Sequence, residues 1–212
     1  GVSFRIMSKK PKGLAVLGST GSVGTQTLDI VRAFPNDFNV IGLACNRNLK
    51  LLQSQIEEFE PDYIHCNGTE SEMASLKSNG CQDCDLDTMV GDPNVDMVVT
   101  ATVGDVALSP TLTAIDAGKH IALANKETVV MAGEIVSARA KNAGVPLLPL
   151  DSEPNAIWQC LSGEDSTVSR LMITASGGAF RDRGPSSLAG VTPEEALNHP
   201  TWKMGPKITV DS

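Results

Sequence analysis

The sequence predicts an α/β fold: a Rossmann-like, mostly parallel sheet with crossover helices, followed by the start of an α+β domain. Short apolar runs alternate with segments of helical periodicity up to about residue 150, which is typical of parallel strands joined by helices. The composition changes after Leu150, so we place one domain at residues 11–150 and a second, incomplete domain at residues 151–212. With 41% hydrophobic residues among 212, the chain can bury a substantial core.

Composition and charge exclude several classes of partner. The formal net charge is −8, the sequence pI is ≈ 4.8, and no basic run forms a groove-like pattern. We therefore expect no nucleic-acid surface and no docking on a membrane. Residues 1–6 resemble neither a signal peptide nor part of the fold, so Met7 is the expected natural start. Because no Ser- and Arg-rich transit segment precedes the fold, we expect the bacterial cytoplasm as the compartment.

The five cysteines are scattered along the chain. Cys81 and Cys84 form a single C-x-x-C in a polar, acidic connection, and no second pair accompanies them. A zinc or redox role for this pair is therefore the minor alternative, and a reduced intracellular protein is the better interpretation.

The first element is a short apolar strand, Leu14–Leu17, that leads directly into a glycine-rich turn. Residues 18–24 read GSTGSVG, a G-x-x-G-x-x-G spacing that differs from the commoner G-x-G-x-x-G, and helical residues follow from Gln26. Glycines let the backbone approach phosphates closely, and a helix amino terminus offers unpaired N–H groups with a partial positive charge. The sequence therefore predicts a site for a dinucleotide pyrophosphate, with a simple tight turn as the alternative.

The elements that follow extend the sheet in order. Their bounds depend on β-branched runs for strands, helical spacing for helices, and proline or glycine at the ends. His65 is interpreted as a packing residue, and the last strand, with two prolines, is expected at an edge. The expected strands are Phe38–Ala44, Tyr63–Cys66, Asp96–Ala101, His120–Ala124 and Val145–Leu150; the expected helices run from Leu49 to Phe59, from Leu108 to Gly118, and from about Asn125 to Ala143 with Gly144 as cap.

Beyond Leu150 the expected elements are shorter. Because the chain stops two residues after the last of them, we expect it to be a fragment of a longer protein. They are a helix capped by Asp151 or Ser152 with Pro154 in its first turn, a strand at Leu171–Thr174, a helix opened by the capping box Thr192–Glu195, and a strand from Lys207 to Val210.

The end of the second strand predicts the kind of dinucleotide. Ligands of an open parallel sheet gather at the carboxyl ends of its strands. This end carries Cys45-Asn46-Arg47-Asn48, which contains no carboxylate for the ribose hydroxyls of NAD. Arg47 between two asparagines suits a 2′-phosphate, so we predict NADP(H), with a solvated surface arginine as the alternative.

Two further strand ends carry charged residues. Lys126 opens a helix and opposes its dipole, so we expect an anionic ligand or a carboxylate nearby, with a surface charge pair as the alternative. Asp151 and Glu153 stand two residues apart with no His or Cys near them in sequence, which suits a hard cation, Mg²⁺ or Mn²⁺. An exposed helix amino terminus is the alternative, but the place at the mouth of the expected cleft favours the metal.

Two segments of the second domain could contact a substrate. Ser176-Gly177-Gly178 offers a hydroxyl and N–H groups at an expected strand end, which suits a phosphate. Residues 199–205 place His, Trp and Met in a loop bounded by proline and glycine. Because exposed apolar residues are costly unless they cover something, we expect a lid, with a loop packed on its own domain as the alternative.

Taken together, these motifs resemble the 1-deoxy-D-xylulose 5-phosphate reductoisomerase family. The resemblance runs from about Lys12 to the last residue and depends on residues 18–24, 124–127, 150–153, 176–178 and 199–205. It implies an NADPH-binding Rossmann-like domain, a central catalytic domain with the metal and substrate site and the lid loop, and a carboxyl-terminal helical domain absent from this chain. It also implies conversion of 1-deoxy-D-xylulose 5-phosphate, a small phosphorylated sugar, into 2-C-methyl-D-erythritol 4-phosphate for non-mevalonate isoprenoid synthesis by a homodimer.

The resemblance also implies roles for individual residues. For the cofactor these are Thr20, Gly21, Ser22, Val23, Asn46, Arg47, Asn48, Asn125, Glu127 and Gly205; for the substrate Lys126, Ser152, Ser176, His199, Trp202 and Ser212; for the metal Asp151 and Glu153; and for catalysis Lys126, Asp151, Glu153 and His199. The family continues with an Asn-Lys pair for the substrate phosphate and a glutamate that completes the metal site. We therefore expect this piece to bind NADPH but to turn over poorly or not at all.

Two other functions stay open. One is a plain NADP-dependent dehydrogenase of the semialdehyde or homoserine type, which would need no divalent metal. The other is a non-catalytic dinucleotide sensor, whose function would survive the substitution Asp151→Asn. The carboxylate pair, Lys126 and the expected lid argue against the sensor.

Overall fold

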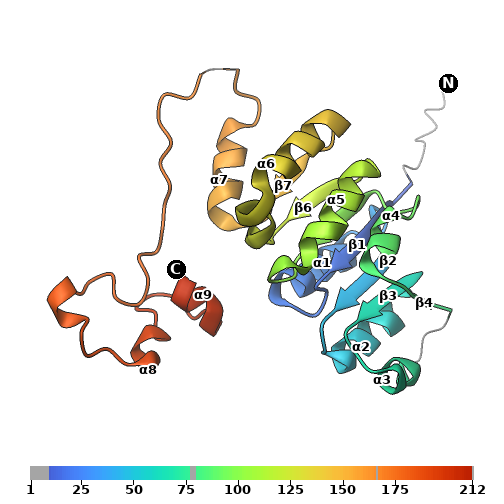
Figure 1. Ribbon diagram of the computed structural model, residues 1–212, viewed down its shortest axis with the longest axis horizontal. Helices are drawn as coiled ribbons and strands as arrows, with labels where there is room; N and C mark the ends of the chain where they lie inside the picture. The colour runs from blue at the N-terminus through green and yellow to red at the C-terminus, as the bar shows by residue number, and fades with distance from the viewer. Residues whose placement is uncertain (1–9, 77–79, 166, 212) are drawn as a thin grey trace, which may run out of the picture. The chain divides into compact units, whose positions relative to one another are not determined.

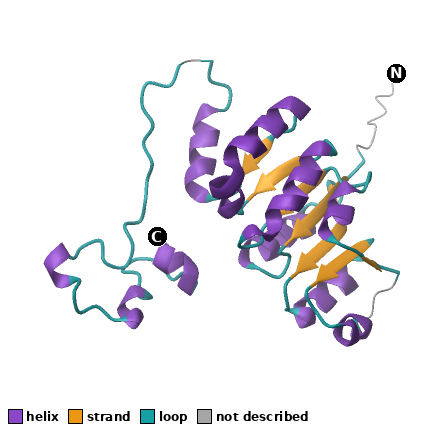
Figure 2. Cartoon of the chain, in the orientation of Figure 1, coloured by secondary structure: helices purple, strands orange, loops and turns teal. Residues whose placement is uncertain are grey.

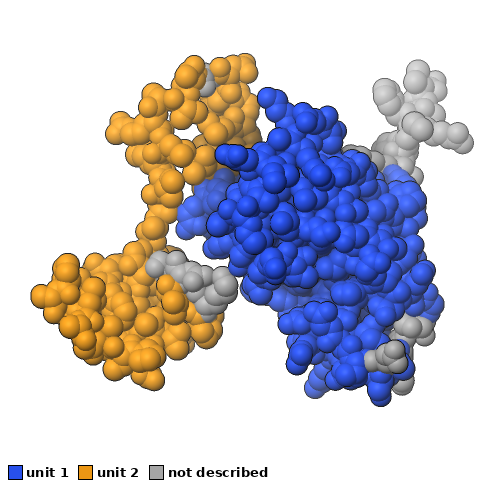
Figure 3. Space-filling model, viewed as in Figure 1, with its two compact units in different colours: residues 1–155 blue, residues 156–212 orange. Residues whose placement is uncertain are grey.

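The structure is a computed structural model that describes residues 10–76, 80–165 and 167–211. It divides into two compact units, residues 1–155 and 156–212, which Figure 3 colours separately. Residues 1–6, interpreted as a leader outside the fold, and Ser212, expected to contact the substrate, lie outside the described residues.

The first unit contains a seven-stranded sheet whose strand pairings are all parallel within the described residues (Figure 2). The order β4-β3-β2-β1-β5-β6-β7 places β1 in the interior and β7 at an edge, as its prolines predict. The strands are β1 (Lys12–Leu17), β2 (Phe38–Cys45), β3 (Tyr63–Cys66), β4 (Gln82–Asp83), β5 (Met97–Thr100), β6 (His120–Leu123) and β7 (Leu147–Pro149).

Helices cover both faces of the sheet (Figure 1). Successive side chains of β1 point to opposite faces, and both sets are buried, Leu14 and Val16 in one cluster and Ala15 and Leu17 in the other. The first cluster includes apolar residues of α1 and α2, and the second includes those of α4, α5 and α6. These helices are α1 (Ser22–Ala33), α2 (Leu49–Phe59), α4 (Leu86–Gly91), α5 (Leu108–Asp116) and α6 (Lys126–Ala143).

Most of the expected elements of this unit are confirmed, including the end of α6 at Gly144. Three short elements are not expected from the sequence: β4, α4 and α3 (Glu70–Ser75). The sequence also gives no sign that α6 is interrupted at Ala132, whose φ of −142° and ψ of 26° are not helical. Asp105–Ala107 forms a 3₁₀ turn, η1, directly before α5.

The helix α7 (Ser152–Leu161) begins where the sequence predicts, with Pro154 in its first turn. The described part of the second unit adds only short helices: η2 (Pro185–Ser187), α8 (Pro193–Ala196) and α9 (Pro206–Asp211). The capping box is confirmed, because Thr192 and Glu195 each bond the other's backbone N–H. No helix in the described ranges is long and apolar enough to cross a membrane.

The prediction of two strands in the second unit is wrong. Leu171–Thr174 is irregular, and Leu171, Met172 and Ile173 are 56%, 75% and 72% exposed. An apolar run becomes a strand only beside another strand, and this unit's described residues supply none.

The second predicted strand, from Lys207 to Val210, is helical instead and forms part of α9. Pro206 opens that helix, where a missing N–H costs nothing. The Thr209 hydroxyl donates to the Gly205 carbonyl at 3.0 Å and so supports the helical turn.

Candidate functional site

The carboxyl ends of the parallel strands meet at one edge of the sheet in the first unit. The glycine turn follows β1, residues 46–48 follow β2, residues 101–104 follow β5, residues 125–127 follow β6, and Asp151 follows β7. The polar segments expected to contact a dinucleotide and a metal are therefore brought to the same edge. This edge is the candidate functional site.

The glycine turn packs so tightly that two of its positions exclude a side chain. Gly18 has a φ of +89°, and an added Cβ would lie 2.5 Å from the Ala101 carbonyl oxygen. A Cβ on Gly24 would lie 2.2 Å from the Gly18 carbonyl oxygen. The absence of side chains at these two glycines lets the amino end of α1 pack closely against the end of β1.

The amino terminus of α1 fits an anionic ligand. Its N-cap residue, Gly21, makes no side-chain capping hydrogen bond, and the first turn carries no acidic residue. The N–H groups of this turn and the helix dipole are thus directed at whatever lies beyond the helix. A pyrophosphate suits this donor set, as the sequence predicts for residues 20–23.

Arg47 lines a cavity of about 330 Å³ at the end of β2, as a 2′-phosphate site requires. Its asparagine neighbours are engaged within the protein: Asn46 Oδ1 accepts from Asn67 Nδ2 at 3.1 Å, and Asn48 caps α2 through Leu51 N. We expect these two asparagines to shape the pocket, while Arg47 supplies its charge.

The same cavity contains a carboxylate that the sequence reasoning missed. Glu72 accepts hydrogen bonds from the backbone N–H and the hydroxyl of Thr69, and these bonds, with a smaller contribution from Arg47, lower the pKa of its carboxyl. The capping-box pattern of Thr69 and Glu72 was visible in the sequence and could have revealed this element.

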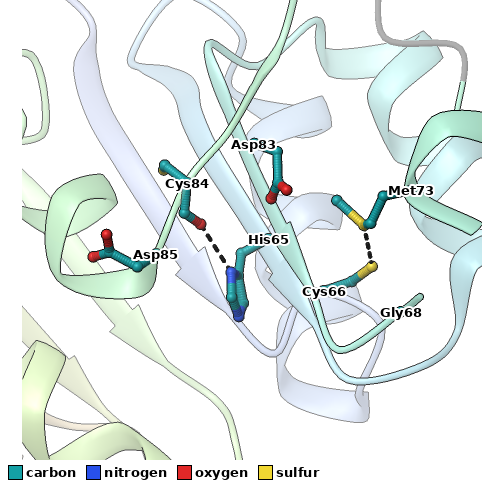
Figure 4. A pocket seen from close by; sticks show the side chains of 7 residues that line it. All are labelled: His65, Cys66, Gly68, Met73, Asp83, Cys84 and Asp85. Carbon is teal, nitrogen blue, oxygen red and sulfur yellow. Dashed lines mark hydrogen bonds between the residues drawn. The ribbon is translucent and has the colours of Figure 1, made fainter. Parts of the chain in front are cut away.

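A larger cavity, of about 500 Å³, lies at the ends of β3 and β4 and contains none of the expected site residues (Figure 4). His65 Nδ1 lies 2.8 Å from the Cys84 carbonyl oxygen, and Cys66 Sγ lies 2.7 Å from Met73 Sδ. His65 and Cys66 point in different directions, as neighbours on a strand do. The described residues form no group of three or more His, Cys, Asp or Glu that could hold a metal.

Asn125 joins the loop after β5 to the start of α6. Its Nδ2 donates to the carbonyl oxygens of Thr102 and Gly104 at 2.9 and 3.0 Å. Its Oδ1 accepts from the backbone N–H and the hydroxyl of Thr128 at 2.8 and 2.6 Å. The side chain is 1% exposed, so it positions Lys126 and Glu127 from beneath the candidate site.

Lys126 lies near a carboxylate, which fits both the expected partner and the alternative of a surface charge pair. Its Nζ lies 3.4 Å from Asp151 Oδ2, and the two side chains are 55% and 44% exposed. An ion pair this exposed contributes about 0–1 kcal/mol to stability. The fold therefore gains little stability from this ion pair. The pair shows that a cation and a carboxylate lie close together at this edge of the sheet.

Asp151 and Glu153 offer the hard oxygen donors that Mg²⁺ and Mn²⁺ prefer. Both side chains are partly exposed at the amino end of α7, and Asn155 Nδ2 ties this end to the Pro149 carbonyl of β7 at 2.6 Å. Two carboxylates leave most positions around an octahedral ion to water, substrate or other residues. The pair fits the expected metal as part of its ligand set.

In the second unit, Ser176 and His199 lie together although 23 residues separate them. His199 Nδ1 accepts from the N–H groups of Thr201 and Trp202 at 3.1 and 2.9 Å, so its proton is assigned to Nε2. That nitrogen lies 3.2 Å from Ser176 Oγ, to which it donates. The imidazole is 7% exposed and thus holds the serine hydroxyl in place.

Arg181 is a residue of this cluster that the sequence reasoning missed. Its guanidinium donates to Thr201 Oγ1 at 3.0 Å and to the Ser176 carbonyl oxygen at 3.4 Å. It therefore places a positive charge beside the segment expected to contact a phosphate. Trp202, expected in the lid, is 58% exposed.

Fold and strand order together define an α/β protein with a Rossmann-like parallel sheet. The profile of the 1-deoxy-D-xylulose 5-phosphate reductoisomerase family matches residues 14–133, and that of the family's C-terminal domain matches residues 147–212. The chain belongs to the 1-deoxy-D-xylulose 5-phosphate reductoisomerase family.

Individual relatives agree with this assignment. The chain is 48% identical over 208 residues to 1-deoxy-D-xylulose 5-phosphate reductoisomerase of Geobacillus sp. (strain WCH70), covering 95% of this chain and 55% of that relative. It is 46% identical over 211 residues to that of Shouchella clausii (strain KSM-K16), with the same coverage. The chain thus spans about half the length of the curated relatives it matches.

Solved structures show the same fold. A DOX-P reductoisomerase in complex with NADPH, fosmidomycin and magnesium superimposes with a TM-score of 0.82 and 38% identity, covering 94% of this chain and 54% of that one. The enzyme from Zymomonas mobilis in complex with NADPH gives 0.80 and 36%, covering 89% and 52%. The family and these structures do not favour a plain dehydrogenase or a non-catalytic sensor.

Proposed function

We propose that the full-length protein containing this chain is an NADPH- and divalent-metal-dependent reductoisomerase that converts 1-deoxy-D-xylulose 5-phosphate into 2-C-methyl-D-erythritol 4-phosphate. The observation that carries the proposal is the shared strand edge. An amino terminus of α1 without a side-chain cap and the Lys126–Asp151 pair both lie at the carboxyl ends of the same parallel sheet. The relatives and solved structures named above support the same activity.

In this proposal the first unit binds the cofactor. The backbone around Thr20, Gly21, Ser22 and Val23 receives the pyrophosphate, and Arg47 receives the 2′-phosphate. Glu72 lines the same cavity, and its carboxylate would repel a phosphate placed close to it. Glu127 and Gly205 are proposed as further cofactor contacts, and Asn125 acts from below by fixing the start of α6.

Asp151 and Glu153 are proposed to hold the divalent ion. When bound, NADPH supplies a hydride and the metal supplies Lewis acidity toward the substrate's oxygens. Asp151 pairs with Lys126 at 3.4 Å where both side chains are exposed, so its carboxylate would be available to a divalent ion in place of the ammonium. Metal binding would therefore release the Lys126 ammonium to contact an anionic oxygen of the substrate.

The substrate's phosphate is proposed to lie against the second unit. Ser176 presents a hydroxyl oriented by His199, and Arg181 adds a nearby positive charge. Ser152 and Ser212 are further proposed contacts, and Trp202 is proposed to close over the bound sugar. We also propose a homodimer for the full-length protein and a bacterial cytoplasmic location.

The test is NADPH oxidation by the full-length protein with 1-deoxy-D-xylulose 5-phosphate, with and without divalent cation. We expect oxidation that EDTA abolishes and that Mg²⁺ or Mn²⁺ restores. Activity insensitive to EDTA would favour a metal-independent dehydrogenase instead. NADPH binding without turnover under any of these conditions would favour a sensor.

A further inference from the structure

Gln55 is a polar side chain inside the apolar core. It lies on the buried face of α2 between Leu52 and Ile56 and is 2% exposed. Burying glutamine costs side-chain entropy and desolvation, so a buried amide needs hydrogen bonds in return. An apolar side chain would fill this position at lower cost, so the amide calls for a specific explanation.

The amide reaches into the glycine turn. Gln55 Nε2 donates to the backbone carbonyl oxygen of Ser19 at 2.9 Å. The same stretch is held from the strand side, because the N–H groups of Gly18 and Ser19 both donate to the Ala44 carbonyl at 2.8 Å. The Ala44 carbonyl thus binds the N–H groups of the turn, while Gln55 binds the carbonyl of the peptide that joins Ser19 to Thr20.

The geometry of a trans peptide turns this contact into a constraint on a donor. The C=O and the N–H of one peptide plane point in opposite directions. Because the Ser19 carbonyl points inward to Gln55, the Thr20 N–H of the same peptide must point outward. The proposed pyrophosphate would lie on that side, at the amino terminus of α1, which begins at Ser22.

We propose that Gln55 is a positioning residue for the pyrophosphate of the dinucleotide, an inference that rests on the proposed NADPH-binding function. It fixes the Ser19–Thr20 peptide so that the Thr20 N–H is directed at the phosphate before the ligand arrives. Gln55 Oε1 and Ser19 Oγ, both buried, have no hydrogen-bond partner among the described residues. The Nε2 bond to the turn is therefore the polar contact that accounts for an amide at this position.

The proposal predicts an effect that is selective for one part of the ligand. Gln55 contacts the turn after β1, whereas Arg47 lies after β2 and lines a separate cavity. Loss of the Gln55 amide should weaken ligands that carry a pyrophosphate. It should leave a ligand that carries only the 2′-phosphate nearly unaffected.

The experiment compares NADPH with adenosine 2′-monophosphate in the full-length protein. Gln55→Met keeps the length of the side chain and removes the donor, and we expect it to raise the Kd for NADPH about tenfold, the order expected when a buried carbonyl loses its partner. The Kd for adenosine 2′-monophosphate should change less than about twofold. In turnover, the KM for NADPH should rise while kcat stays within about twofold.

Two controls separate positioning from general destabilisation. Gln53→Met makes the same change on the same helix at a residue whose amide bonds Glu57, and it should leave both Kd values unchanged. Ile56→Val weakens the packing of α2 without touching an amide, and it should also leave NADPH binding unchanged. Equal weakening of both ligands by Gln55→Met, or an unchanged NADPH Kd, would overturn the proposal.

A measurement on the parent protein needs no variant to fold. NADPH, but not adenosine 2′-monophosphate, should slow hydrogen exchange at the Thr20 amide by about tenfold or more. An unchanged exchange rate in saturating NADPH would overturn the positioning role. A parent protein that does not bind NADPH would instead contradict the proposed function, so the two failures are distinguishable.

Discussion

The steric requirement at Gly24 gives a prediction whose size follows from the structure. Gly24 lies in the first turn of α1, and a Cβ there would lie 2.2 Å from Gly18 O and 2.6 Å from Ser19 Cα. That is roughly 1 Å closer than a normal non-bonded contact, and both atoms belong to the backbone of the glycine turn. In Gly24→Ala, the turn and the helix must therefore move apart.

The cost of this movement exceeds what alanine gains in a helix. Overpacking costs about 1–3 kcal/mol, and contact with backbone atoms places this site near the upper end. Alanine regains about 1 kcal/mol in helix propensity. We expect a net loss of about 2 kcal/mol in stability, together with an NADPH Kd raised at least about tenfold because the donors of the turn are displaced.

The assay is chemical unfolding and NADPH titration of the full-length protein, with Gly91→Ala as the matched control. Gly91 is also helical, at the end of α4, but an added Cβ there meets nothing within 4 Å. The control should keep its NADPH affinity and lose no stability. If Gly24→Ala binds NADPH as tightly as the parent, the turn does not hold the cofactor as proposed.

Three further predictions concern other parts of the chain. Asp151→Asn should abolish metal-dependent NADPH oxidation. The free energy of unfolding should change by less than about 1 kcal/mol in a thermal melt, because the ion pair that the substitution breaks is exposed. Retained activity would show that Asp151 does not hold the metal. Asn125→Ala should lower the free energy of unfolding by about 2–4 kcal/mol, since it leaves two carbonyls and a helix cap without their partner; denaturant unfolding with an unchanged midpoint would contradict this. Burial, with a neighbouring Cys66, raises the pKa of the Cys45 thiol to about 11, so at pH 8 it is almost entirely protonated; mass spectrometry should show iodoacetamide labelling the exposed Cys160 well before Cys45, and the reverse order would refute this.

The central strands were predictable because their residues carry the signal themselves. Runs such as residues 98–100 of β5 are β-branched and buried on both faces, which few structures other than a parallel strand accommodate. Gly144 likewise marks the end of α6 through local backbone preference. These features depend on neighbours in sequence.

The missed features depend on partners distant in sequence. The two-residue β4 is a strand only because β3 lies beside it, and Leu171–Thr174 lacks such a neighbour in the described residues. The contacts of Gln55 with Ser19 and of His199 with Ser176 likewise cross from one element to another. The sequence predicted residues for most of the candidate site, whereas the supporting contacts needed coordinates.

The central claim is that the carboxylate pair at the start of α7 faces the nicotinamide end of a dinucleotide held by the glycine turn. The most direct test is paramagnetic relaxation of bound NADP⁺ by Mn²⁺ in the full-length protein, with Asp151→Asn as the metal-site control. We predict that Mn²⁺ broadens the nicotinamide protons far more than the adenine protons, and that the substitution removes the effect. Broadening of the adenine protons alone, or of neither ring, would contradict the account.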